Sequence, residues 1–155
     1  MNTGQISKII SSNENETRNL GLKIGQKLQG GEVFLLQGDL GFGKTRFVKG
    51  VVEGAGIDEE VTSPSFTITN LYKGNEINIY HIDFYRLTEA GVMLHELKEI
   101  TKDKSNVVLI EWPEIVKDKL PIDYIEIIIE DMGDTKRQFT IKYPEEKKYL
   151  FEGLN

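Results

Sequence analysis

The run Gly38–Thr45 reads G-x-x-x-x-G-K-T and follows the apolar run Val33–Leu36. Glycines in such a run let the backbone bend around a phosphate and direct N–H groups at it, beside the positive end of the next helix. In this pattern Lys44 reaches the β- and γ-phosphates, and the hydroxyl of Thr45 binds magnesium. The pattern therefore predicts a nucleoside triphosphate site between a strand and a helix.

Composition limits the class of protein. With 155 residues, the chain is predicted to form a single domain, 1–155, with a charged C-terminal tail from about residue 145. The absence of cysteine excludes thiol catalysis, cysteine-ligated zinc and disulfides, and it fits an intracellular protein. The polar N-terminus lacks a signal-peptide core and no apolar run is long enough to span a membrane, so we expect a soluble, cytoplasmic protein.

The formal net charge of −6 argues against a large basic surface that binds nucleic acid directly. Any role with a nucleic acid is therefore expected to depend on a partner protein.

The hydrophobic pattern predicts an α/β protein around this strand, loop and helix. Helical spacing of apolar residues predicts three helices, at about 15–28, 45–53 and 88–102. Two strands are predicted at 32–36 and 107–110, and two antiparallel pairs at 67–72 with 77–86 and at 124–129 with 138–143. We expect a P-loop NTPase-like three-layer sandwich, with a central mostly parallel sheet, an antiparallel hairpin and flanking helices.

Two acidic residues are candidates for the metal and water chemistry of a bound triphosphate. Magnesium prefers six oxygen ligands, normally one or two carboxylates with hydroxyl, phosphate and water oxygens, so Thr45 alone cannot hold it. Glu111 ends a buried strand, where open α/β sheets place their sites, and is predicted to bind the metal with Thr45. Asp83 is predicted as an outer ligand or as the group that orients the attacking water. The sequence leaves open which of the two acids orients the water.

Three further features lie near these acids in the sequence. Thr62, Ser63 and Ser65 supply hydroxyls in a proline-containing loop, where related nucleotide enzymes have an element that senses the γ-phosphate; an ordinary polar turn is the alternative. Trp112 either forms a wall of the site or packs behind Glu111. His81 shares a strand face with Asp83 and either hydrogen-bonds it or is a structural residue.

Four motifs in this order resemble the TsaE (YjeE) family, the ATPases of bacterial tRNA threonylcarbamoyladenosine biosynthesis. They are Gly38–Thr45, Thr62–Phe66, His81–Leu87 and Ile110–Pro113. The resemblance runs from the helix near Thr17 to the strand near Tyr143. Three positions depart from the usual family pattern. Phe42 stands where the family usually has a small residue, and Arg46 stands where it has a second hydroxyl residue. Ser65 stands where the family often has a threonine.

The resemblance implies that ATP and Mg2+ are the ligands, with Thr45 and Glu111 at the metal and Asp83 near the reaction. It implies adenine contacts around Glu14. It also implies two partner proteins, of the TsaB and TsaD type, that form the transferase and through which the protein meets tRNA. Hydrolysis, weak in the isolated protein and activated by the partners, would reset that complex between turnovers.

Together, these arguments predict a set of site residues. The predicted catalytic residues are Lys44, Asp83 and Glu111. The predicted nucleotide-binding residues are Gly38, Asp39, Leu40, Gly41, Phe42, Gly43, Lys44, Thr45, Arg46, Glu14 and Trp112.

Two other functions stay open on the sequence: a small P-loop kinase that phosphorylates a small molecule, and a nucleotide-gated binding module without hydrolysis. Such kinases usually have an arginine-rich lid, whereas this chain has only Arg18, Arg46, Arg86 and Arg137. A GTP-specific switch is disfavoured because the chain has no Asn-Lys-x-Asp motif.

Overall fold

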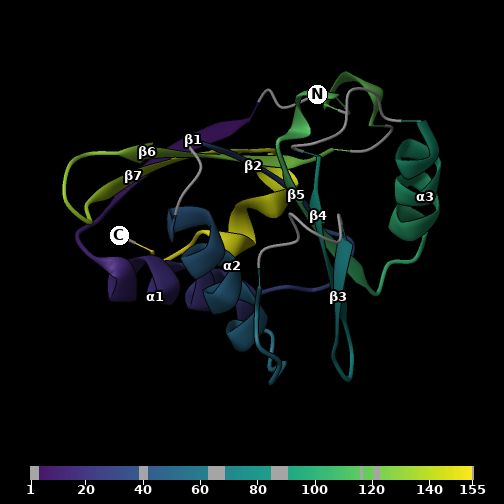
Figure 1. Ribbon diagram of the computed structural model, residues 1–155, viewed down its shortest axis with the longest axis horizontal. Helices are drawn as coiled ribbons and strands as arrows, with labels where there is room; N and C mark the ends of the chain where they lie inside the picture. The colour runs from purple at the N-terminus through teal and green to yellow at the C-terminus, as the bar shows by residue number, and fades with distance from the viewer. Residues whose placement is uncertain are drawn as a thin grey trace.

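The computed structural model describes residues 4–38, 42–62, 69–84, 91–115, 117–120 and 123–154. Its centre is a seven-stranded sheet in the order β1-β7-β6-β2-β5-β4-β3 (Figure 1). The strands are β1 (Gln5–Ser11), β2 (Val33–Gly38), β3 (Thr69–Lys73), β4 (Asn78–Asp83), β5 (Asn106–Glu111), β6 (Ile125–Asp131) and β7 (Arg137–Tyr143). Neighbours among β6, β2, β5 and β4 are parallel. Strands β1, β7 and β3 pair antiparallel at the two sides, so the α/β fold is as predicted and its sheet is mixed.

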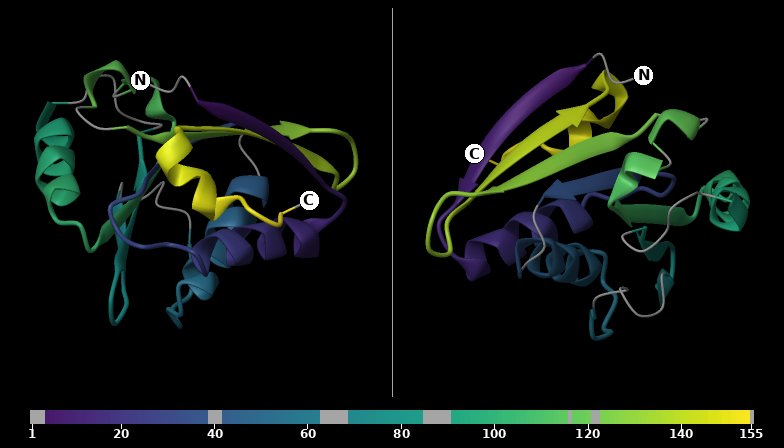
Figure 2. Two further views of the ribbon diagram at one scale, coloured as in Figure 1. Left: turned by 180° about the vertical axis from the view of Figure 1, so that it is seen from behind. Right: turned by 45° about the horizontal axis from the view of Figure 1, so that its top comes forward.

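Helices cover both faces of this sheet. The helices α1 (Glu14–Gly25) and α2 (Phe42–Gly54) lie side by side on one face, together with the C-terminal 3-10 helix η4 (Glu145–Leu150) (Figures 1 and 2). The helix α3 (Gly91–Lys102) packs on the other face. Two short 3-10 helices, η2 (Pro113–Ile115) and η3 (Lys117–Lys119), follow β5. None of the helices in the described part of the chain is long and apolar enough to cross a membrane.

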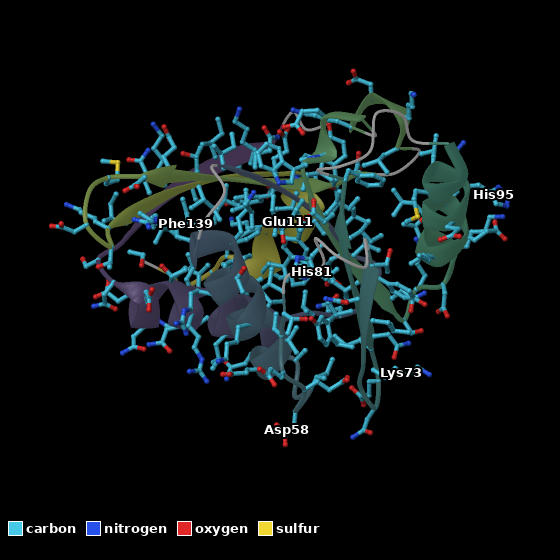
Figure 3. All side chains as sticks on the ribbon, viewed as in Figure 1. Asp58, Lys73, His81, His95, Glu111 and Phe139 are labelled. Carbon is cyan, nitrogen blue, oxygen red and sulfur yellow. The ribbon has the colours of Figure 1, made fainter. Side chains whose placement is uncertain are left out.

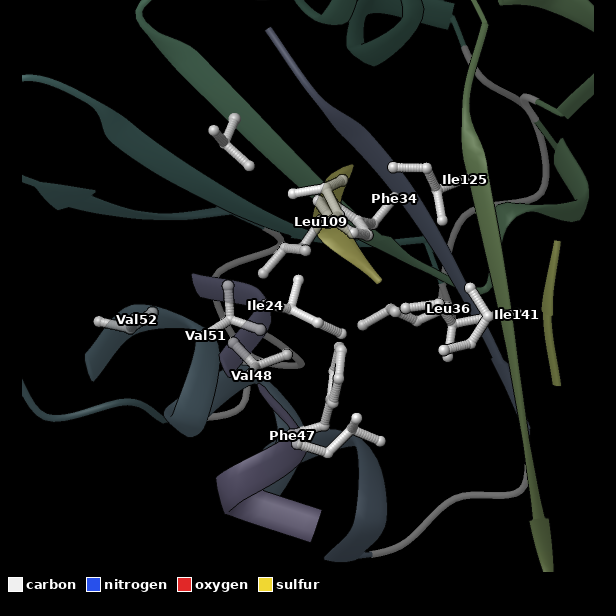
Figure 4. Close-up of a cluster of buried hydrophobic side chains, with 14 of the residues drawn as sticks. Ile24, Phe34, Leu36, Phe47, Val48, Val51, Val52, Leu109, Ile125 and Ile141 are labelled. Atoms are coloured by element: carbon white, nitrogen blue, oxygen red, sulfur yellow. The ribbon is translucent and has the colours of Figure 1, made fainter. Parts of the chain in front are cut away.

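The sheet separates two hydrophobic cores. The larger core joins the sheet to α1 and α2 (Figure 4), and its fully buried members include Ile24, Phe34, Phe47, Leu109 and Ile141. The smaller core joins the sheet to α3 through Leu97, Val33, Leu35, Val108 and Ile110. Successive residues of β2 and β5 face opposite cores, which explains why both strands are apolar almost throughout. These two strands therefore lie at the centre of the molecule.

The predicted and observed elements differ most at the ends of the chain. Strand β1 was not predicted, and it pairs with β7 along its whole length. The tail from Glu145 forms η4, and the apolar residues Leu150, Phe151 and Leu154 enter the larger core. The predicted start of α3 lies outside the described residues.

A seam of glycines joins α1 to α2. Gly21 and Gly25 of α1 meet the backbone of α2, and Gly50 and Gly54 of α2 meet the backbone of α1. A Cβ atom on any of the four would lie 2.0, 2.1 or 2.2 Å from a carbonyl oxygen of the other helix. Residues later in α1 meet residues later in α2, so the two helices run parallel. The seam therefore brings their N-terminal ends to the same edge of the sheet.

Candidate functional site

The glycine-rich run connects the end of β2 at Gly38 to the start of α2 at Phe42. Gly38 has φ of +146°, and a Cβ there would lie 2.5 Å from the carbonyl oxygen of Ile129, so only glycine fits. At Gly43 a Cβ would meet no described atom closer than 3.4 Å. Packing within the described residues thus does not require glycine at this position, whereas a phosphate close to the backbone would.

Some predicted site residues lie outside the described part of the chain. They are Asp39, Leu40, Gly41, Ser63 and Ser65, together with the side chain of Phe42. Thr62 precedes one of these gaps, and its carbonyl oxygen accepts a hydrogen bond from Nδ2 of Asn70 at 3.1 Å. Its backbone N–H donates to the hydroxyl of Tyr72 at 3.4 Å. The start of this loop is therefore tied to β3.

Lys44 lies in the first turn of α2, with a side chain that is only 4% exposed. Its Nζ donates to the carbonyl oxygen of Gly38 at 3.2 Å. The same atom lies 3.7 Å from Oε1 of Glu111 and 4.4 Å from the centroid of the Trp112 ring. A buried ammonium requires such partners, an opposite charge and an aromatic face among them. The first turn of α2 contains no acidic residue, so the helix itself leaves this positive region uncompensated.

The two predicted acids lie at the carboxyl ends of neighbouring parallel strands. Asp83 on β4 is paired in register with Glu111 on β5. His81 lies two residues before Asp83, and its Nε2 hydrogen-bonds Oε2 of Glu111. Figure 3 labels His81 and Glu111 in the interior of the molecule. All three residues are buried, with exposures of 0% for His81, 5% for Asp83 and 6% for Glu111. The hydrogen bond of His81 thus crosses to the neighbouring strand, a contact that the sequence did not indicate.

The carboxylate of Glu111 is ionised although its side chain is buried. Burial by itself raises its pKa. His81 and Lys44 each lower the pKa through a hydrogen bond and through electrostatic attraction, and together they outweigh the effect of burial. The pKa of Glu111 therefore lies below its ordinary value of 4.5. An ionised carboxylate only accepts hydrogen bonds, so Nε2 of His81 is the donor. One carboxylate oxygen is held by His81, and the other faces Lys44.

Trp112 turns the chain sharply after Glu111. Its φ of +55° lies in the left-handed region, which costs a non-glycine residue on the order of 1–3 kcal/mol. The ring contacts the ammonium group of Lys44 and also packs against the smaller core. Trp112 therefore packs against the core, as one interpretation of the sequence has it, and its role as a wall of the site stays a prediction.

A shallow hollow lies beside the first turn of α2, at the N-terminal ends of both helices. It is lined by Glu14, Thr17, Gly43, Arg46, Thr135 and Arg137. An ion pair of 3.3 Å joins Arg46 to Glu14 across the two helices, so two predicted nucleotide-binding residues lie together. Thr135 and Arg137 come from the β6–β7 hairpin and were missed in the sequence. Only the strand order, which places this hairpin beside α2, identifies them.

The oxygen atoms of Glu111 and Thr45 suit a magnesium ion that is bound together with a nucleotide. Within the described ranges, no group of three or more His, Asp or Glu residues is placed to hold a metal ion. Magnesium in nucleotide sites needs fewer protein ligands, because phosphate and water oxygens complete its coordination. The ionised carboxylate of Glu111 and the half-buried Thr45 fit magnesium that arrives with a nucleotide.

Comparisons with known proteins show which family the chain resembles. Residues 11–139 match the model of the family described as threonylcarbamoyl adenosine biosynthesis protein TsaE. The tRNA threonylcarbamoyladenosine biosynthesis protein TsaE of Nostoc sp. is 38% identical over 144 residues, which cover 91% of this chain and 88% of that protein. The protein of the same description from Bacillus subtilis is 35% identical over 132 residues, covering 83% of this chain and 80% of the relative.

A solved structure shares the fold of this chain. The crystal structure of Bacillus subtilis YdiB superimposes with a TM-score of 0.80 at 32% identity, covering 97% of this chain and 94% of that chain. A family match over most of the chain, relatives of this identity and a shared fold are three concordant findings. The chain belongs to the TsaE family.

Proposed function

We propose that this protein binds and hydrolyses ATP as the switch component of the machinery that makes tRNA threonylcarbamoyladenosine. Hydrolysis resets the transferase complex between turnovers. The two partner proteins, of the TsaB and TsaD type, form that complex, and contact with tRNA passes through them in the cytoplasm. The observation that carries the proposal is the contact of the buried Lys44, in the first turn of α2, with Glu111 and Trp112 at the end of β5.

The residues of this cluster have separate proposed roles. Lys44 binds the β- and γ-phosphates, and the backbone of the glycine-rich run binds them through its N–H groups. Thr45 and Glu111 would hold magnesium, which when bound neutralises charge on the phosphate oxygens. One oxygen of Glu111 is already held by His81 and the other faces Lys44. With Glu111 assigned to the metal, we propose that Asp83, its register partner on β4, orients the attacking water.

The hollow beside α2 is the proposed place of the nucleoside. Gly43 and Arg46 lead into it from the phosphate-binding run, and Glu14 closes its other side. Five of its six lining residues have a polar or charged side chain, and such side chains can form hydrogen bonds with the edge of a purine base. This assignment gives Glu14 and Arg46 a role in nucleotide binding rather than in the reaction.

An ATPase assay with and without the partners tests the proposal. We expect slow magnesium-dependent hydrolysis by the isolated protein and faster hydrolysis when both partner proteins are added. Lys44→Ala is the control that separates this activity from a contaminating ATPase. Rapid turnover by the isolated protein would contradict a switch role. Equal partner affinity with ATP and with a non-hydrolysable analogue would instead favour a binding module.

A further inference from the structure

We propose that His81 is a positioning residue, which fixes the carboxylate of Glu111 so that a single oxygen is presented to the phosphate end of the site. The inference rests on the proposed role of Glu111 in holding magnesium. His81 does not itself contact the nucleotide or the metal in this proposal. It acts through its hydrogen bond to Oε2 of Glu111.

The position of His81 in the sheet supports this role. It lies on β4 with an exposure of 0%, and the neighbour in register on β5 is Leu109. Ile79, two residues earlier on the same face, is apolar and also fully buried. On this face His81 therefore has the aliphatic neighbours Ile79 and Leu109, while Asn70 of β3 is its register neighbour on the other side.

The imidazole is held by one of its two nitrogens. Nε2 bonds Glu111, while Nδ1 is buried and makes no hydrogen bond to any of the described residues. A buried polar atom without a partner costs free energy, so a histidine here is unfavourable for stability. The bond to Glu111 is the interaction that explains its presence.

The hydrogen bond determines how Glu111 is presented. Oε2 bonds His81, and Oε1 lies 3.7 Å from Nζ of Lys44. Loss of the donor would free the carboxylate to rotate and to bring both oxygens toward the ammonium group. A carboxylate paired in that way is a poorer metal ligand. Residues that orient metal ligands in this manner commonly contribute about 10- to 100-fold to metal affinity.

Binding measurements on two polar variants test the proposal. In His81→Gln the side-chain amide nitrogen comes close to the position of Nε2, whereas in His81→Asn it stays nearer the strand and does not reach Glu111. Calorimetry would measure the affinity for a non-hydrolysable ATP analogue with magnesium and with a chelator. Ile79→Val is the control for a small change of packing on the same strand face, and circular dichroism checks that each variant is folded.

We expect His81→Asn to lose about tenfold or more of the magnesium-dependent gain in affinity while binding in chelator stays near the wild-type value. His81→Gln should recover most of that gain, and Ile79→Val should keep all of it. Equal magnesium dependence in His81→Asn and the wild type would overturn the proposal, as would an equal defect in His81→Gln.

These outcomes are separate from the fate of the proposed function. If wild-type affinity does not depend on magnesium, Glu111 holds no metal and the role of His81 is refuted. The readout is binding of an analogue that is not hydrolysed. Failure of the partners to stimulate hydrolysis would therefore refute the switch role and leave the role of His81 standing.

Discussion

Gly21→Ala tests whether the glycine seam holds α1 against α2. Alanine is the better helix former by about 1 kcal/mol, so without a partner helix this substitution would stabilise the protein. In the structure, however, the new Cβ would lie 2.2 Å from the carbonyl oxygen of Phe47, whereas ordinary contacts begin at 3.4 Å. The difference of 1.2 Å is too large for a rigid backbone carbonyl to absorb.

Relief of this clash requires the helices to separate, which loosens the contacts of the other three glycines as well. Overpacking of a core typically costs about 1–3 kcal/mol, and the shared seam argues for the upper part of that range. After the gain in helix propensity, we expect the free energy of unfolding to fall by about 1–2 kcal/mol. For a chain of this size the melting temperature would fall by roughly 2–8 °C.

Urea unfolding monitored by circular dichroism measures the effect. Asn19→Ala is the matched control, because Asn19 lies exposed on the same helix and alanine there changes helix propensity without entering the seam. The control should be neutral or slightly stabilising. An increase in stability for Gly21→Ala similar to that of the control would refute close contact between the helices.

Three further results are expected. Lys44→Ala should abolish ATP binding in calorimetry, because it removes the main positive partner of the phosphates; unchanged affinity would refute the phosphate site. Glu111→Ala and Asp83→Ala should still bind ATP but lose magnesium-dependent hydrolysis in single-turnover assays, and full activity in either variant would remove that residue from the site. Tyr149→Phe should lower the free energy of unfolding by about 1.5–3 kcal/mol at pH 8, since the Tyr149 hydroxyl donates to the buried carboxylate of Glu32. Burial, and secondly the neighbouring Glu32, raise the pKa of Tyr149 above its ordinary value of 10.0. The hydroxyl therefore makes its full contribution to the free energy of unfolding below pH 10 and loses that contribution as the pH rises further. The stability difference from the wild type should therefore narrow above pH 10, and a constant difference would contradict this reasoning.

The elements around the phosphate-binding run could be predicted because their signals are local. The apolar residues of β2 and β5 and the glycines beside Lys44 stand in short, regular patterns. Strand β1 gave no such signal: it is an edge strand, and Ile6 and Ile10 are exposed at 62% and 44%. The apolar residues of the C-terminal segment follow a run of charges and were not recognised as part of the core.

The missed contacts of the site depend on how separate elements meet. The sequence placed His81 beside Asp83 because the two share a strand face. The hydrogen bond to Glu111 follows from the register of β4 against β5, which no motif encodes. The glycine seam had a visible signal, since the G-x-x-x-G spacing occurs at Gly21 and Gly25 of α1 and at Gly50 and Gly54 of α2. It becomes informative only when the two helices are considered together.

The parallel course of α1 and α2 also has an electrostatic consequence. Each helix carries a partial positive charge of about half an elementary charge at its N-terminus, and the seam holds two such ends next to each other, where they repel. Glu14 and Glu16 compensate the end of α1, while the first turn of α2 contains no acid. A phosphate chain at the start of α2 would supply the missing negative charge and so stabilise the helix pair that binds it.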